Sequence, residues 1–174
     1  MIFETERLFA RPIHEMDLEG FYAMHSNPNV MQYTSQKPMS FDECKTDMQR
    51  VMNCYNDPAQ TFLVWSVVRK VDNCFIGTCA IILREDNEND MGYRIMEKYW
   101  GNGYATEIAA GLIRYGFEVL KKDDLVGVAD IRNVASIKII EKHMIFEKEF
   151  YNTELECTDR EYRITRQQYL DSFS

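Results

Sequence analysis

The hydrophobic and polar residues of this chain follow two periods, one typical of helices and one typical of strands. From Tyr104 to Val119 the apolar residues recur at helical spacing, which predicts a helix with one buried face. Two runs rich in β-branched and aromatic residues, Thr61–Arg69 and Cys74–Leu83, flank Val71-Asp72-Asn73 and predict a hairpin. Further strands are expected at Arg7–Arg11, Met91–Met96, Leu125–Ala129, Phe146–Tyr151 and Arg160–Thr165.

Polar capping residues predict where the other helices begin. Ser40, followed by Glu43 three residues later, is typical of a capping box. The predicted helices run from the cap Asp17 to about His25, from the cap Ser40 to about Cys54, and from the cap Asn133 over Val134–His143. The order is strand, two helices, an antiparallel meander, helix, strand, helix and hairpin. This order predicts an α+β domain around one mixed sheet, because a doubly wound fold would alternate strands and helices.

The composition indicates a single globular domain over residues 1–174. Hydrophobic residues make up 45 % of the chain and charged residues 28 %, and 174 residues are enough for one core. The net charge of −8 argues against nucleic acid or an anionic membrane as a partner, since both need a basic surface. The charge is compatible with an amine substrate, and the alternative is that it mainly serves solubility.

The chain shows no targeting or membrane signal, so we expect a cytoplasmic protein. No apolar run approaches the length of a membrane span, and the start MIFETERL lacks the features of a signal peptide. The cysteines are odd in number, irregularly spaced and without a C-x-x-C pair, so neither a disulfide framework nor a zinc site is predicted. We expect five reduced cysteines: Cys44, Cys54, Cys74, Cys79 and Cys157.

A glycine turn directly before a helix is the strongest chemical signal in the chain. The run Met91–Met96 leads to Gly101-Asn102-Gly103, and the helix from Tyr104 follows at once. The first N–H groups of a helix have no internal acceptor and favour an anion, and glycine lets that backbone approach a phosphate closely. The turn therefore predicts a phosphorylated ligand. No Walker lysine follows, and Thr106 stands where a dinucleotide fingerprint needs a third small residue.

The segment around this turn, Tyr99-Trp100-Gly101-Asn102-Gly103-Tyr104-Ala105-Thr106, resembles the acyl-CoA pyrophosphate loop of the GNAT N-acetyltransferase superfamily. It is most similar to the Rim-type branch, the relatives of ribosomal-protein N-terminal acetyltransferases. Three further segments resemble that branch in the same order: Thr5-Glu6-Arg7-Leu8 with Arg11-Pro12, Met91-Gly92-Tyr93, and Asn133-Val134-Ala135-Ser136 with Glu141-Lys142. Two departures are Trp100, where the superfamily has Gln or Arg, and the lack of a glycine after Lys142.

The resemblance implies a fold, a cosubstrate and its binding residues. The fold is a mixed, mostly antiparallel sheet flanked by helices, with a V-shaped splay between the fourth and fifth predicted strands. The cosubstrate is acetyl-CoA, whose pantetheine arm lies in the splay, and the backbone amide of Ile95 holds the thioester carbonyl. The coenzyme pyrophosphate is bound by N–H groups of Gly101, Asn102, Gly103, Tyr104, Ala105 and Thr106. Asn133 is expected to bind the coenzyme or to cap its helix, and the two roles are compatible.

The resemblance also implies direct attack by a primary amine in a ternary complex. Ser136 is the implied proton donor to the departing sulfur, with an ordinary first-turn helix residue as the alternative. Asp90 is the candidate base, with a solvated turn aspartate as the alternative. The acidic turn at Glu85, Asp86 and Glu88 either attracts an ammonium group or is an ordinary hairpin tip. Tyr33 and Trp65 either line the acceptor pocket or belong to the core.

The acceptor predicted from these features is a small amine or a protein or peptide N-terminus. The acidic charge favours a small amine or a short peptide end. We expect a monomer or a homodimer. Two other functions stay open: a non-catalytic acyl-CoA-binding or sensing domain on the same scaffold, and a nucleotide-binding oxidoreductase. The second is disfavoured because the chain lacks the βαβ order.

Overall fold

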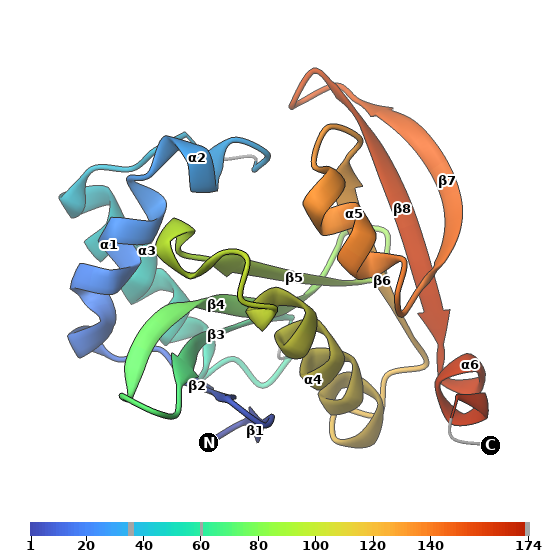
Figure 1. Cartoon of the computed structure of the whole chain (residues 1–174), viewed down its shortest axis with the longest axis horizontal. Helices are drawn as coiled ribbons and strands as arrows, with labels where there is room; N and C mark the ends of the chain where they lie inside the picture. The colour runs from blue at the N-terminus through green and yellow to red at the C-terminus, as the bar shows by residue number, and fades with distance from the viewer. Residues whose placement is uncertain (35–36, 60, 173–174) are drawn as a thin grey trace.

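The computed structural model describes residues 1–34, 37–59 and 61–172, which form one sheet with helices on both faces (Figure 1). The strands are β1 (Phe3–Glu4), β2 (Leu8–Pro12), β3 (Phe62–Arg69), β4 (Cys74–Leu83), β5 (Asn89–Ile95), β6 (Asp124–Asp130), β7 (Ile145–Asn152) and β8 (Cys157–Thr165). The helices are η1 (Glu15–Asp17), α1 (Leu18–His25), α2 (Pro28–Met31), α3 (Phe41–Cys54), η2 (Glu97–Tyr99), α4 (Tyr104–Glu118), α5 (Val134–Ile140) and α6 (Arg166–Asp171).

The sheet has the mixed, mostly antiparallel topology that was predicted. Its strand order is β1-β2-β3-β4-β5-β6-β8-β7. Of the neighbouring strands in this order, β5 and β6 run parallel and the other pairs run antiparallel. These two strands are in register at a single position, Asp90 with Val126, near the start of both. In Figure 1 the C-terminal end of β5 lies toward α1, away from β8 and β7. The fourth and fifth predicted strands therefore pair at one end and diverge from there.

Side chains alternate along β3 and so divide the core between the two faces of the sheet. Leu63, Trp65 and Val67 point into the main cluster, which α4 covers with residues such as Ile108 and Leu112. Trp65 is 2 % exposed and packs edge-on against an aromatic ring of α4. Trp65 is therefore a core residue and lines no acceptor pocket.

The opposite face of the sheet carries a second cluster beneath α1 and α3. Phe62 and Val64 of β3 pack there against buried residues such as Phe21 of α1 and Met48 and Val51 of α3. The helix α3 begins at the predicted cap, because the side chain of Ser40 accepts from the N–H of Glu43 and that glutamate bonds back.

Three local predictions were wrong or incomplete. The Asp17 side chain does not cap α1, because it is buried in other contacts described below. The helix after Asn133 ends at Ile140, and not at His143. The short elements β1, α2 and α6 were not predicted, although Thr165 forms a capping box at the start of α6. All five cysteines are free. Among the described residues, no helix has the length and apolarity to cross a membrane.

Candidate functional site

The glycine turn and the first turn of α4 form one continuous stretch of backbone. Gly101 and Gly103 have φ angles of 75° and 78°, in the left-handed region that other residues rarely adopt. Gly103 is the N-cap of α4, and its carbonyl accepts the first helical bond, from the N–H of Glu107 at 3.1 Å. The N–H groups before Glu107 therefore have no acceptor within the helix. The residues predicted to bind the pyrophosphate thus share one helix N-terminus.

The N-terminal segment of the chain holds this turn in place. The carboxylate of Glu107 accepts from the hydroxyl of Thr5 at 2.5 Å and from Nε of Arg7 at 2.6 Å. Arg7 also donates from Nη1 to the carbonyl of Asn102 at 3.0 Å. Burial alone would raise the pKa of Glu107, but these hydrogen bonds outweigh it and lower that pKa. The Thr5–Leu8 motif therefore has a structural role beside the turn.

Trp100 joins the turn to the end of β5. Its Nε1 donates to the carbonyl of Ile95 at 2.7 Å, and Asn102 donates from Nδ2 to the carbonyl of Trp100 at 2.9 Å. The residue that replaces the superfamily's Gln or Arg thus fixes the angle at which the turn leaves the strand.

The free edge of β5 presents backbone donors beside the turn. Met96 donates to the carbonyl of Ile76 at 2.9 Å, and the preceding pair in the ladder is Ile95 with Gly77. Hydrogen-bonded and non-hydrogen-bonded pairs alternate along an antiparallel ladder, so the N–H of Ile95 points away from β4. The same alternation directs the N–H of Tyr93 to that edge, which β6 has left. The sequence analysis named Ile95 as a donor at this edge and did not name Tyr93.

The start of α5 lies across from this edge. Asn133 caps α5, since its Oδ1 accepts from the N–H of Ser136 at 3.1 Å. No acceptor for its Nδ2 is found in the described part of the chain. The Oγ of Ser136 lies 3.4 Å from the Oη of Tyr93, so a hydrogen bond joins α5 to β5. Burial raises the pKa of Tyr93, and the bond with Ser136 lowers it in part.

Asp90 lies inside β5, and not in the turn before it. It pairs with Ile82 of β4 and Val126 of β6, and its side chain is partly buried. This burial raises the pKa of Asp90 to about 7, against a smaller lowering by Arg84 and a further rise from Glu161. A carboxylate of this kind exchanges its proton near neutral pH, as a general base requires.

The acidic turn is an ordinary hairpin tip whose charges are largely compensated. Asp86 forms an ion pair with Arg84, and Glu88 forms one with Arg163 at 2.8 Å. Tyr33 lies near Arg132, whose guanidinium carbon is 6.0 Å from the centre of its ring. Of the two aromatic residues considered for the acceptor pocket, only Tyr33 is outside the core.

The predicted base and the predicted oxyanion donor are not adjacent. Asp90 and Ile95 are five residues apart in an extended strand, which separates their Cα atoms by roughly 16 Å at about 3.3 Å per residue. Tyr93 is three residues from Asp90, roughly 10 Å by the same measure. Of the two free N–H groups, that of Tyr93 is therefore nearer to both Asp90 and Ser136.

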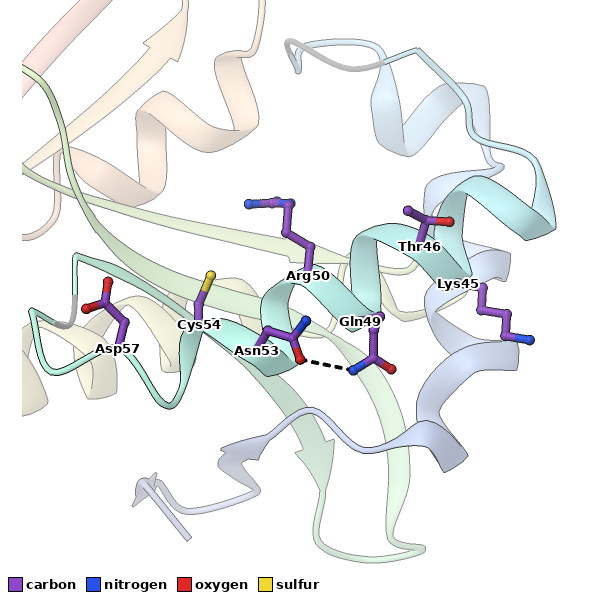
Figure 2. Close-up of a pocket in the computed structure, with 7 residues that line it drawn as sticks. All are labelled: Lys45, Thr46, Gln49, Arg50, Asn53, Cys54 and Asp57. Carbon is purple, nitrogen blue, oxygen red and sulfur yellow. Dashed lines mark hydrogen bonds between the residues drawn. The ribbon is translucent and has the colours of Figure 1, made fainter.

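Two surface grooves lie along α3. The larger has a volume of about 730 Å³ and is lined by Lys45, Thr46, Gln49, Arg50, Asn53, Cys54 and Asp57. Figure 2 shows Arg50 and Gln49 on opposite sides of the helix, with Gln49 bonded to Asn53. The second groove, of about 410 Å³, shares Thr46 and Arg50. Neither groove includes a residue of β5, the glycine turn or α5.

One group of side chains among the described residues has ligand atoms close enough together for a metal ion. It comprises Asp130, Cys157 and Asp159, whose ligand atoms lie within 4.8 Å of one another. The Asp130 carboxylate is already held by Arg132, and Asp159 accepts from Asn152 at 2.8 Å. Protein donors thus occupy both carboxylates.

Comparison with known proteins identifies the family to which the chain belongs. The family model described as "Acetyltransferase (GNAT) domain" matches residues 7–143. The uncharacterized N-acetyltransferase YoaA of Bacillus subtilis is 29 % identical over 151 residues, which cover 85 % of this chain and 84 % of that protein. A GNAT-family acetyltransferase structure from Bacillus anthracis superposes with a TM-score of 0.83 at 20 % identity, covering 95 % of this chain and 98 % of that one.

Another solved structure of the same fold is spermidine N-acetyltransferase from Vibrio cholerae in complex with CoA and spermine. Its TM-score is 0.79 at 18 % identity, covering 94 % of this chain and 98 % of that one. Because the family model matches most of its length, the chain belongs to the GNAT acetyltransferase family and is an acyltransferase.

Proposed function

We propose that this enzyme transfers the acetyl group of acetyl-CoA to the primary amine of a small molecule or a peptide N-terminus, as a member of the Rim-type branch. One observation carries the proposal. The free N–H groups of β5 lead directly into the free N–H groups of the Gly101–Thr106 turn. An extended pantetheine arm that ends in a pyrophosphate needs donors in this sequence.

Each backbone donor has a distinct partner in the coenzyme. The turn binds the pyrophosphate, and Asn133 donates from its unused Nδ2. Of the two donors at the edge of β5, Ile95 is the one expected from the sequence for the thioester carbonyl. The N–H of Tyr93 suits that carbonyl better because of its place beside Ser136, and Ile95 then holds an amide of pantetheine. Either donor stabilises the oxygen as it gains charge in the tetrahedral intermediate.

The reaction requires two proton movements. The amine nitrogen bonds to the thioester carbon, the carbon–sulfur bond breaks, and an ammonium substrate releases two protons in all. One passes to Asp90 directly or through water, since an alkylammonium has a pKa of about 10 and must be deprotonated. The other leaves the nitrogen as the carbon–sulfur bond breaks: the hydroxyl of Ser136, which Tyr93 orients, gives its proton to the sulfur of CoA and regains the one from the nitrogen. The products are the N-acetyl amine and the CoA thiol.

The glycine turn gives the sharpest test of coenzyme binding. We expect Gly103→Val to lower acetyl-CoA affinity more than 100-fold, measured by calorimetry. Its φ of 78° is strained for valine, and the side chain would enter the phosphate approach. The matched control is Ala110→Val on the exposed side of α4, which introduces the same residue in the same helix. Unchanged affinity in a folded Gly103→Val variant would refute the assigned turn.

A CoA-release assay over amines, N-terminal peptides and aminoglycosides tests turnover itself. Ser136→Ala should lower kcat and leave acetyl-CoA affinity nearly intact, because Ser136 acts on the departing sulfur. A wild-type rate in that variant would remove Ser136 from the chemistry. Acetyl-CoA binding with no CoA release on any acceptor would replace the enzyme proposal by an acyl-CoA sensing role.

A further inference from the structure

Four residues form a polar row across the face of the sheet beneath α1 and α3. Arg11 of β2 pairs with Ser66 of β3, Ser66 pairs with Thr78 of β4, and Thr78 pairs with Arg94 of β5. Directly opposed residues of antiparallel strands point to the same face, so the row has an arginine at each end.

No carboxylate of the described residues forms an ion pair with the Arg94 end of the row. Among the described residues, no hydrogen bond or ion pair of its guanidinium is found, although the side chain is only partly exposed. Burial lowers the pKa of Arg94, against a smaller opposite effect of Asp47. Asp47 itself is bound by Arg50, through Nη2 at 2.8 Å. His25 is buried near Arg94, and burial lowers the pKa of His25 to about 4, so it is neutral and supplies no charge.

Open space separates Arg94 from Asp90 on this face. Gly92 lies between them, two residues from each, and a Cβ added there would meet no atom within 4 Å. Side chains of alternate residues share one face of a strand, so Asp90, the gap above Gly92 and Arg94 follow one another in a line of roughly 13 Å. The strand thus presents a proton acceptor, a space and a cation.

We infer that the acceptor is a small amine that also carries a carboxylate, with its amine above Gly92 and its carboxylate on Arg94. This inference rests on the proposed acetyl transfer and names the substrate class for it. The planar fork of arginine matches a carboxylate with two parallel hydrogen bonds. The same charge repels a polyamine, so Arg94 also disfavours acceptors that carry a second cation in this position.

The experiment compares L-α-amino acids with their carboxamides in the CoA-release assay, with spermidine and a neutral monoamine alongside. Each carboxamide keeps the side chain and the amine position and removes the negative charge. Wild type should prefer carboxylates, and Arg94→Gln should raise KM for them by about 10- to 100-fold, the worth of one charge-assisted pair. The KM for carboxamides should change little. Arg94→Glu should reverse the preference in favour of spermidine.

Two controls separate this inference from the function beneath it. Arg160→Gln removes a partly exposed arginine of β8, which forms an ion pair with Glu149, and should leave the preference unchanged. Acetyl-CoA affinity by calorimetry should be equal in wild type and both Arg94 variants. If wild type acetylates amines but prefers carboxamides or spermidine, or if Arg94→Gln leaves the preference intact, the inference fails and the transferase stands. If no acceptor in the panel leads wild type to release CoA, both the inference and the proposed transfer fail.

Discussion

The polar row has an arginine at each end, and the two arginines differ in their surroundings. One forms an ion pair within the fold, and the other has no ion pair with a described residue. Arg11 and Arg94 lie on the same face of the sheet and in one register line. Arg11 meets the Asp17 carboxylate through Nη1 and Nη2, both at 2.7 Å. Arg94 meets no carboxylate in the described part of the chain. The arginine whose charge the fold does not use is the one that points to a ligand.

The Arg11 end is closed by further donors. The Asp17 carboxylate also accepts from the hydroxyl of Ser66 at 2.7 Å and from the N–H of His14 at 3.0 Å. Burial alone would raise the pKa of Asp17, but these donors together lower it. A buried carboxylate and its donors stabilise the fold together. Removing one of these groups leaves a buried polar partner with a hydrogen bond unmade.

The largest effect is expected from breaking that set. Asp17→Ala should lower the free energy of unfolding by about 3–5 kcal/mol, since it leaves the partly buried Arg11 guanidinium without its carboxylate partner. Denaturant unfolding at pH 7 measures the change, and Glu85→Ala, an exposed carboxylate of the hairpin turn, is the control. A loss of stability no larger than that of Glu85→Ala would show that the ion pair of Arg11 contributes no more to the fold than an exposed carboxylate does.

The second effect concerns Asp90, the proposed base, which lies on the same face of β5 as Arg94. Its pKa of about 7 predicts that kcat/KM rises about tenfold per pH unit below 7 and levels off above, because the base acts unprotonated. Asp90→Asn should lower kcat about 100-fold, equal to roughly 2.7 kcal/mol, and abolish that pH dependence. A variant that keeps the pH profile of wild type would assign the profile to another group.

The same substitution has a stability signature of known sign. Folding raises the pKa of Asp90 above its unfolded value, so its contribution to stability is present at pH 4 and is lost as the pH rises through 7. Asp90→Asn, which does not ionise, should therefore gain stability relative to wild type at pH 8 compared with pH 5. Melting temperatures at the two pH values measure this difference.

Local sequence signals were enough to predict most elements. The Ser40 and Glu43 pair, the Asn133 cap and the Gly101–Gly103 turn are set by residues within a few positions of one another, and all three are found in the structure. The mixed sheet followed from the order of such elements. Short-range hydrogen bonds can be predicted from the sequence because both partners lie within a few residues of each other.

Contacts between distant segments were beyond the sequence. Asp17 has the residue type and position of a helix cap, yet Ser66, 49 residues away, and Arg11 hold its side chain instead. The role of Tyr93 depends on Ser136, 43 residues away. That Arg94 has no partner among the described residues is a property of the whole face, which no pattern along one strand reveals. The residues that sequence reasoning missed are those whose partners come from another element.

A smaller effect is expected in the middle of the row. Ser66→Ala removes one hydrogen bond to the charged Asp17 and should cost about 2 kcal/mol of unfolding free energy. The double variant Ser66→Ala with Asp17→Ala should lose less than the sum of the two, because the bond is already absent in the second background. Additive losses would show that Ser66 stabilises the fold without Asp17.

The smallest effect is expected at Arg94, and it separates the two ends most directly. Arg94→Met keeps the aliphatic volume and removes a partly buried charge that has no partner in the described part of the chain. The free energy of unfolding should stay the same or rise by up to about 1 kcal/mol. Arg11→Met is the matched control in the same row, and it should cost about 3–5 kcal/mol because the buried Asp17 carboxylate is left without its cation.

Stabilisation by a bound ligand tests the role of Arg94 separately. With acetyl-CoA saturating, a carboxylate-bearing amine that binds Arg94 should raise the melting temperature of wild type more than that of Arg94→Met, in proportion to the affinity lost. The carboxamide should shift both proteins alike. A destabilised Arg94→Met that responds to both ligands as wild type does would make Arg94 a second structural arginine, equal in kind to Arg11.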